Sequence, residues 1–175
     1  MTIMKRMTLV TLALLAFPHL ASSDETIVAL TIDEIREDSA VLDGRDYVST
    51  GQPDEEILRK ASDAGFVAVI DMRTASEDRG YDEAATVETL GMSYISLPVA
   101  GADDTSFENA AQLDEILAGI DGPVLLHCAS GNRVGALFAL RASLAGASDE
   151  EALAVGKAAG LTRLEETVKE RLAAE

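Results

Sequence analysis

Residues 124–135 read Val124-Leu125-Leu126-His127-Cys128-Ala129-Ser130-Gly131-Asn132-Arg133-Val134-Gly135. The apolar run at 124–127 is typical of a strand buried on both faces, and residues 134–144 have a helical pattern. The residues between them are small or tolerant of turns. A strand that passes through a short loop into a helix is characteristic of α/β proteins, whose ligands bind beyond the C-terminal ends of the strands. The loop at 128–133 is therefore the first candidate for a functional site.

The alternation of strands and helices extends through much of the chain. In chain order, the pattern predicts a helix at 54–64, a strand at 66–70, a helix at 81–90, a strand at 93–99 and a helix at 105–119. Capping-box patterns at 105–108, 148–151 and 162–165 each predict the start of a helix. Together these elements predict an α/β fold with a largely parallel central sheet flanked by helices.

The N-terminal part of the fold has a different pattern. Ser39–Leu42 and residues 46–50 flank the turn-forming pair Asp43-Gly44, which predicts an antiparallel hairpin. Residues 24–38 are polar and acidic around a short apolar stretch. We expect them to contribute only a lead-in or a short edge element.

The first residues have the parts of a secretory signal. Lys5 and Arg6 precede an apolar run at 7–17, and small residues follow at 21–23. The apolar run is shorter than the stretch that a permanent membrane-spanning helix normally needs. An uncleaved membrane anchor is the alternative. The sequence thus predicts a signal peptide at 1–23, a single domain at 24–175, and an exported protein, periplasmic or secreted.

The charge of the chain limits its partners. The net charge is −17, and removal of Lys5 and Arg6 with the predicted leader would take it to −19. Such acidity disfavours nucleic acids and anionic membrane surfaces as partners. A small anionic or phosphorylated substrate stays compatible, because local amide dipoles can override a distant field. No pattern in the sequence indicates the oligomeric state.

Cysteine and histidine are scarce. Beyond the predicted leader the chain has one cysteine, Cys128, and one histidine, His127. An intramolecular disulfide is therefore excluded, and a Cys/His zinc site would lack ligands. We predict no metal and no cofactor.

The loop at 128–133 combines a nucleophile with an anion-binding pattern. Its central residues allow successive backbone N–H groups to converge at a helix N-terminus; they are Ala129, Ser130, Gly131 and Asn132. Arg133 adds a planar donor fork suited to oxyanions. The same surroundings favour the thiolate form of Cys128, which predicts a catalytic nucleophile. The alternative is a buried, inert cysteine in a helix cap.

Residues around this loop have predicted supporting roles. Side chains alternate along a strand, so His127 should point away from Cys128, bond to backbone groups and stiffen the loop rather than act as a base. Arg73 and Glu77 follow the strand at 66–70. We expect them to form an ion pair or to brace the loop, with Asp71 helping to orient it.

Residues 127–133 resemble the signature loop of cysteine-dependent phosphatases of the tyrosine and dual-specificity superfamily. More widely, the chain is similar to the phosphatase-like domain of beta-lactamase hydrolase-like proteins. The similar segments are residues 47–53 (Tyr-Val-Ser-Thr-Gly-Gln-Pro), residues 69–73 (Val-Ile-Asp-Met-Arg) with Glu77, and residues 97–99 (Leu-Pro-Val). The resemblance implies a dual-specificity-phosphatase-like fold in which Cys128 attacks phosphorus and residues 129–133 hold the oxyanion.

The resemblance also implies a general acid on a separate loop, where Asp103 and Asp104 lie. A solvated acidic loop before a helix is the alternative interpretation of these two residues.

The spacing within the loop departs from the phosphatase pattern. Four residues separate Cys128 from Arg133, whereas the phosphatases have five. The shorter loop resembles that of rhodanese-type sulfurtransferases, which carry a cysteine persulfide and need no general acid. Three functions stay open: a phosphatase acting through a phosphocysteine, a sulfurtransferase using a Cys128 persulfide, and a non-catalytic module that binds an anion or a phosphorylated ligand.

Overall fold

The computed structural model describes residues 26–174, which form a sheet covered by helices on both faces. The sheet has the order β1-β2-β5-β3-β4, and every neighbouring pair of strands is parallel. Its strands are β1 (Ile27–Ala29), β2 (Tyr47–Thr50), β3 (Ala68–Asp71), β4 (Ser93–Ser96) and β5 (Val124–His127). This confirms the predicted α/β fold with its parallel sheet. The predicted leader lies outside the described residues.

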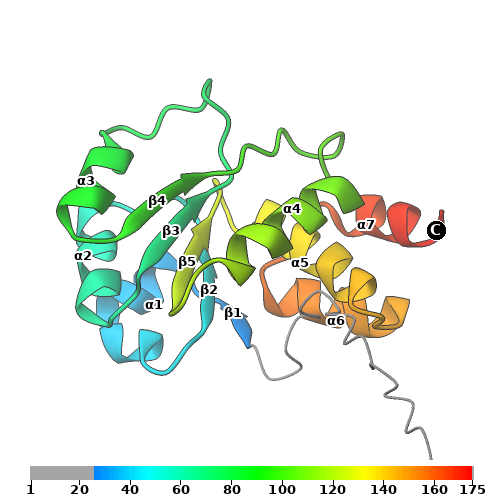
Figure 1. Ribbon diagram of the computed structural model, residues 1–175, viewed down its shortest axis with the longest axis horizontal. Helices are drawn as coiled ribbons and strands as arrows, with labels where there is room; N and C mark the ends of the chain where they lie inside the picture. The colour runs from blue at the N-terminus through cyan, green and yellow to red at the C-terminus, as the bar shows by residue number, and fades with distance from the viewer. Residues whose placement is uncertain (1–25, 175) are drawn as a thin grey trace, which may run out of the picture.

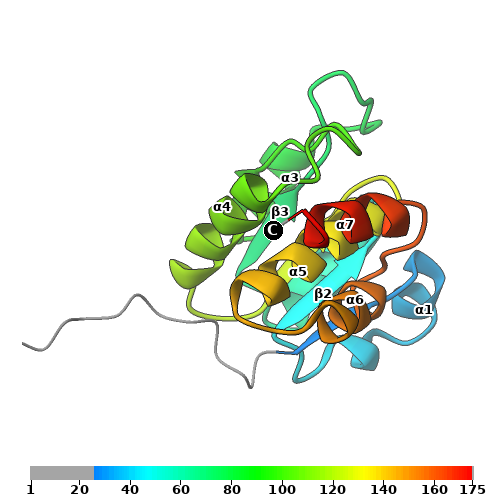
Figure 2. The same cartoon turned by 90° about the vertical axis from the view of Figure 1, so that its right-hand side faces the viewer.

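Two groups of helices enclose the sheet (Figure 1). One face is covered by α1 (Ile32–Glu37), α2 (Glu55–Asp63) and α3 (Glu83–Thr89), together with the 3-10 turn η1 (Ser39–Leu42). The other side holds α4 (Phe107–Ala118), α5 (Asn132–Leu144), α6 (Asp149–Ala158) and α7 (Glu165–Leu172). Figure 2 shows α7 lying against α5. None of the helices within residues 26–174 has the length and apolar character needed to span a bilayer.

The strands alternate their side chains between two apolar layers. Val48, Val69 and Leu125 pack toward α1, α2 and α3, whereas Ile70 and Leu126 pack toward α4 and α5. All four residues of β5 are buried, as the sequence predicts for a strand covered on both faces. Because of this alternation, the first residue after β5 enters the α5 side of the sheet.

The predicted hairpin at 39–50 is wrong. Ser39–Leu42 forms η1 rather than a strand, because the Asp38 side chain accepts a hydrogen bond from Ala40 N at 3.0 Å and caps this turn. Residues 47–50 form β2, which is parallel to both of its neighbours. The preceding helix α1 was not predicted, although Thr31 and Glu34 form a complete capping box at its start.

Two of the three predicted capping boxes differ from the structure. The box at 148–151 is present and opens α6. At the start of α4 the cap is Ser106 alone, which accepts from Asn109 N. The box at 162–165 does not form: α7 begins without a side-chain cap, because the Thr162 hydroxyl donates to Asn132 instead. The connection between α6 and α7 is therefore tied to the start of α5.

A glycine allows α5 to pack closely on this connection. A Cβ atom at Gly135 would lie 2.1 Å from Leu161 N and 2.7 Å from Gly156 O, so no other residue fits there without backbone movement. The end of α6 and the following connection thus lie directly against the first turns of α5. This contact sets the position of residues 162–164 beside the candidate site.

Candidate active site

The loop between β5 and α5 is held by the segment that follows β2. We call residues 128–133 the Cys loop. Gly131 has φ of +78°, and a Cβ atom there would approach Ser49 Oγ to 3.3 Å, so the turn requires glycine. Ser130 forms an isolated antiparallel bridge with Gly51. The Cys loop therefore contacts β2 and the residue that follows it, in addition to continuing from β5.

The N-terminus of α5 is open to a ligand. Its N-cap residue, Gly131, has no side chain, so no cap side chain accepts a hydrogen bond from the first turn. Free N–H groups and the helix dipole together favour an anion at this point. A cavity of about 610 Å³ lies here and is lined by Cys128, Ala129, Ser130, Asn132 and Arg133 of the Cys loop.

Three other connections complete the walls of this cavity. They contribute Thr74, Ser76 and Glu77 from between β3 and α3, Ala100 and Gly101 from between β4 and α4, and Arg163 and Leu164 from between α6 and α7. Cys128 lines the cavity although it is only 1% exposed. The titratable groups that residues 26–174 contribute to the lining are thus one thiol, one carboxylate and two guanidinium groups.

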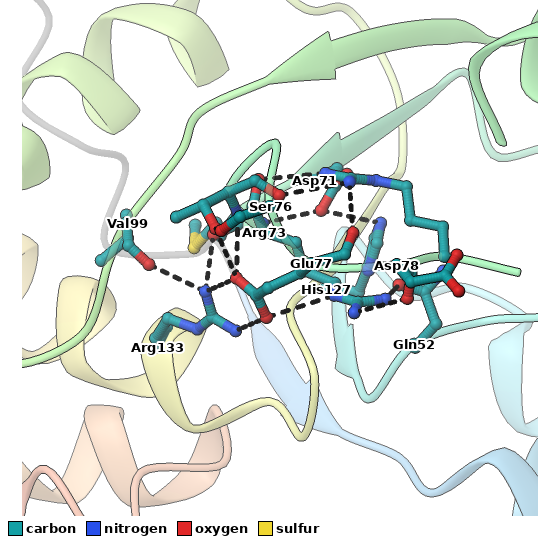
Figure 3. Close-up of polar contacts among 12 residues, drawn as sticks. Gln52, Asp71, Arg73, Ser76, Glu77, Asp78, Val99, His127 and Arg133 are labelled. Carbon is teal, nitrogen blue, oxygen red and sulfur yellow. Dashed lines mark hydrogen bonds and ion pairs between the residues drawn. The ribbon is translucent and has the colours of Figure 1, made fainter. Parts of the chain in front are cut away.

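Arg133 is fixed in this cavity by a two-point ion pair. Its Nη1 and Nη2 donate to the two carboxylate oxygens of Glu77, each at 2.7 Å (Figure 3). Nη1 also donates to Met72 O at 3.1 Å and to Val99 O at 2.8 Å. The guanidinium is therefore locked between the connections that follow β3 and β4, and little side-chain freedom remains to be lost on binding an anion.

Both partners of this ion pair are charged. The hydrogen bonds from Arg133 hold the pKa of Glu77 well below its usual range, assisted by the N–H of Thr74 and by Arg73. The pKa of Arg133 is raised, first by its hydrogen bond with Glu77 and also by its interactions with Cys128. The guanidinium is thus electrostatically coupled to both the carboxylate and the sulfur.

Arg73 and Glu77 have both of the supporting roles that the sequence allowed. Arg73 Nε lies 3.3 Å from Glu77 Oε2, and Glu77 in turn braces the Cys loop through Arg133. Arg73 also donates through Nη1 to Gln52 Oε1 and through Nη2 to Asp78 O at 2.8 Å. Gln52, which lies in the similar segment at 47–53, is therefore a member of the network behind the cavity.

His127 points away from Cys128, as strand alternation predicts. Its side chain does not bond to backbone, however, so that part of the prediction is wrong. Nε2 lies 2.7 Å from Glu83 Oε1 and 3.7 Å from Asp71 Oδ1, on the α3 side of the sheet. The shorter contact lacks the angle of a hydrogen bond, and both ring nitrogens are without a hydrogen-bond partner among the described residues.

Asp71, Glu83 and His127 form a buried cluster of metal-ligand type. One ligand atom of each lies within 4.8 Å of the others, and all three side chains are buried. Arg79 donates to Asp71 Oδ2 at 2.6 Å and lies 3.9 Å from Glu83, so it already supplies positive charge to these carboxylates. The prediction of no metal rested on the scarcity of cysteine and histidine, so it did not include this cluster of one histidine and two carboxylates.

Asp103 and Asp104 are not brought into the cavity lining, although Ala100 and Gly101 of the same connection are. Asp104 Oδ2 accepts a hydrogen bond from Ala100 N at 2.8 Å, and Asp103 is exposed. The Asp104 carboxylate thus stabilises the connection before α4, and neither carboxylate lines the cavity.

Asn132 contributes its backbone to the Cys loop, but its side chain faces elsewhere. Its Oδ1 accepts hydrogen bonds from Thr162 N at 2.8 Å and Leu164 N at 3.3 Å. Arg163 lies between these two residues and was not predicted as a site residue. Residues 162–165 match a helix start, and no pattern in the sequence indicates that a residue 30 positions after Arg133 shares its cavity.

Comparison with known proteins places this geometry in a family. The family model for the beta-lactamase hydrolase-like protein, phosphatase-like domain, matches residues 42–146, which include β2 to β5, the Cys loop and α5. The chain belongs to this family. Its phosphatase-like domain thus carries Cys128 and Arg133 inside the matched range.

The relatives of this phosphatase-like domain include two longer bacterial proteins. A beta-lactamase hydrolase-like protein from Xylella fastidiosa (strain Temecula1) is 31% identical over 116 residues, which are 63% of this chain and 27% of the relative. The protein of the same name from Agrobacterium fabrum is 31% identical over 100 residues, 55% of this chain and 23% of the relative. The chain thus corresponds to about a quarter of the length of these relatives.

Solved structures share the fold of the phosphatase-like domain. A candidate phosphatase from Neisseria meningitidis aligns with a TM-score of 0.62 at 19% identity, over 74% of this chain and 95% of the other. Tk-PTP in its active form aligns with a TM-score of 0.54 at 22% identity, over 77% of this chain and 95% of the other. At identities below 25%, these alignments show that the chain shares the fold of the two solved structures.

Proposed function

We propose that the protein is a cysteine-dependent phosphatase that hydrolyses a phosphomonoester through a phosphocysteine on Cys128. The observation that carries the proposal is the cavity at the start of α5, where Cys128 lies with an arginine fixed by Glu77. Membership of a phosphatase-like family supports the same class of reaction.

The first chemical step is attack on phosphorus. The Cys128 thiolate forms an S–P bond while the bond from phosphorus to the leaving oxygen breaks, and the leaving oxygen departs with the electron pair. Backbone N–H groups of residues 129–133 and the Arg133 guanidinium stabilise the non-bridging oxygens. Water then attacks phosphorus, the S–P bond breaks, and the products are inorganic phosphate and the regenerated thiolate.

The cavity favours leaving groups that need little protonation. Among residues 26–174, Glu77 is the one carboxylate in the lining, and the ion pair with Arg133 keeps Glu77 deprotonated. A deprotonated carboxylate cannot act as a general acid. Aryl phosphates, whose leaving oxygen is a stable phenolate, therefore suit this cavity better than alkyl phosphates.

Asparagine variants of Asp103 and Asp104 test this inference. We expect each variant to hydrolyse 4-nitrophenyl phosphate within about threefold of the wild-type rate, because neither carboxylate lines the cavity. Steady-state kinetics with aryl phosphates of increasing leaving-group pKa give the measurement. A loss of about a hundredfold confined to poor leaving groups would identify the altered residue as a general acid that reaches the substrate after loop movement.

Sulfur transfer is a second candidate, favoured by two observations. Only four residues separate Cys128 from Arg133, and the described cavity has no carboxylic acid free to protonate a leaving group. In this reaction the thiolate attacks the outer sulfur of thiosulfate, the S–S bond breaks, and sulfite leaves with the electron pair. A thiophilic acceptor such as cyanide then takes the sulfur from the persulfide.

Parallel assays on the purified protein separate the candidates. The phosphatase proposal expects release of phosphate from 4-nitrophenyl phosphate, whereas sulfur transfer expects formation of thiocyanate from thiosulfate and cyanide. Turnover of thiosulfate without phosphate release would replace the first proposal with the second. Anion binding with no turnover in either assay would instead favour the non-catalytic module.

We further propose that the protein is exported, because Lys5, Arg6, the apolar run at 7–17 and the small residues at 21–23 have the pattern of a signal peptide. N-terminal sequencing of protein from the extracytoplasmic fraction is expected to start near Asp24. Recovery of the full-length chain from the cytosol would contradict export.

A further inference from the structure

Arg163 is a cation in the cavity that the proposed reaction does not use. Arg163 lines the cavity together with residues of the Cys loop, and it is exposed. Within residues 26–174 it has no hydrogen bond or ion pair. The other guanidinium of the lining, Arg133, is neutralised by Glu77. Within residues 26–174, Arg163 is thus the cation of this lining that is paired with no carboxylate.

The backbone on both sides of Arg163 is fixed to the Cys loop. Asn132 Oδ1 accepts hydrogen bonds from Thr162 N at 2.8 Å and Leu164 N at 3.3 Å, and the Thr162 hydroxyl donates to the same oxygen at 3.1 Å. Asn132 is only 7% exposed. A buried side chain of the loop therefore anchors the segment that carries Arg163, so the backbone at Arg163 keeps a defined place beside the cavity.

The size and charge of the cavity indicate what Arg163 binds. A volume of about 610 Å³ is within the range of roughly 300–1,000 Å³ that accommodates a whole small molecule rather than a phosphate group alone. The Cys128 thiolate and the net charge of −17 oppose the entry of anions. A free guanidinium at the cavity offsets this repulsion and forms two-point contacts with carboxylate or phosphate oxygens.

We propose that Arg163 forms a second anion subsite, so that the substrate is a phosphomonoester carrying a further acidic group, carboxylate or phosphate. The reacting phosphate binds at the Cys loop, and the second acidic group pairs with Arg163. This inference rests on the proposed phosphatase function and specifies its substrate class. Because Arg163 contacts substrate away from the reacting atoms, it acts in specificity.

Matched probes test the subsite without turnover. In the Cys128→Ser protein, isothermal titration calorimetry compares 3- and 4-carboxyphenyl phosphate with the corresponding carbamoylphenyl phosphates, which have nearly the same shape but lack the second charge. We expect at least one carboxylate probe to bind about fivefold more tightly than its amide partner at low salt, the scale of a partly exposed ion pair. The preference should shrink as salt screens the pair.

Variants test whether Arg163 causes the preference for carboxylate over amide probes. Adding Arg163→Ala should bring the ratio of the two affinities to about one, and Arg163→Lys should keep part of the preference. Arg59→Ala removes the same charge from an exposed arginine on α2 that lies outside this cavity, and it should leave the ratio unchanged. Thermal unfolding of each variant checks that the fold is intact.

Each outcome has a distinct meaning. Equal binding of carboxylate and amide probes, or a preference that survives Arg163→Ala, would overturn the second subsite and leave the phosphatase proposal standing. Failure of every phenyl phosphate to bind would overturn the proposed function itself, and the subsite with it.

Discussion

Cys128→Ser is expected to lower turnover of an aryl phosphate by at least about a thousandfold, because a serine hydroxyl is a far weaker nucleophile and Glu77, the carboxylate of the described lining, is already engaged by Arg133. His127, the neighbouring residue, faces the opposite side of the sheet and contacts Glu83. No other cysteine lies in the chain that could replace the thiol. The measurement is phosphate release under single-turnover conditions.

Folding controls make this result specific. Cys128 is 1% exposed and packs in the apolar layer beneath α5, so the smaller, more polar serine can also affect stability. Thermal unfolding and binding of inorganic phosphate should both show that the folded variant keeps its cavity. Near-normal turnover by folded Cys128→Ser would exclude Cys128 as the nucleophile in either enzymatic candidate.

Glu77→Gln is expected to lower kcat/KM by roughly ten- to a hundredfold, because it releases the Arg133 guanidinium from its two-point contact. A glutamine side chain has one acceptor oxygen and no charge, whereas Glu77 binds both Nη1 and Nη2. Arg133 can then rotate away from the orientation in which it meets the substrate oxyanion. Steady-state kinetics with an aryl phosphate give the comparison.

A neighbouring carboxylate provides the matched control. Asp78→Asn removes the same charge one position away, but the Asp78 side chain accepts from Gly80 N and does not touch Arg133. This variant should keep kcat/KM within about twofold of wild type. Equal losses in the two variants would mean that net charge, and not the brace on Arg133, controls activity.

The pH dependence of stability gives an independent readout of the Glu77 brace. The folded state lowers the pKa of Glu77, so the brace stabilises the protein fully above the unfolded value of about 4.3 and is lost as pH falls through the lowered value. The difference in free energy of unfolding between wild type and Glu77→Gln should therefore be full at neutral pH and decrease in the acid range.

The elements that could be predicted from the sequence are those with strong local patterns. The uninterrupted apolar run predicts β5, and Ser148 with Glu151 predicts the start of α6. The pattern at 39–50 failed because Asp43-Gly44 favours a turn in many contexts, and only the pairing of β2 with β1 and β5 distinguishes a parallel strand from a hairpin.

In the candidate site, too, contacts within one short segment could be predicted, whereas contacts between distant segments could not. Cys128 and Arg133 lie within one short segment, so their shared cavity follows from local sequence. Glu77 was recognised as a supporting residue, but its two-point contact with Arg133 depends on how the connection after β3 folds over β5. Arg163 reaches the cavity only because Asn132 holds the α6–α7 connection, a long-range contact with no local pattern.

The identity of the covalent adduct on Cys128 tests the central claim most directly. Purified protein is mixed with 4-nitrophenyl phosphate, quenched in acid during turnover, and examined by intact-mass and peptide mass spectrometry. The proposal predicts a gain of one phosphoryl group located on Cys128 and absent from Cys128→Ser. Turnover without any phosphoryl adduct, or a gain of sulfur from thiosulfate in a protein that releases no phosphate, would contradict it.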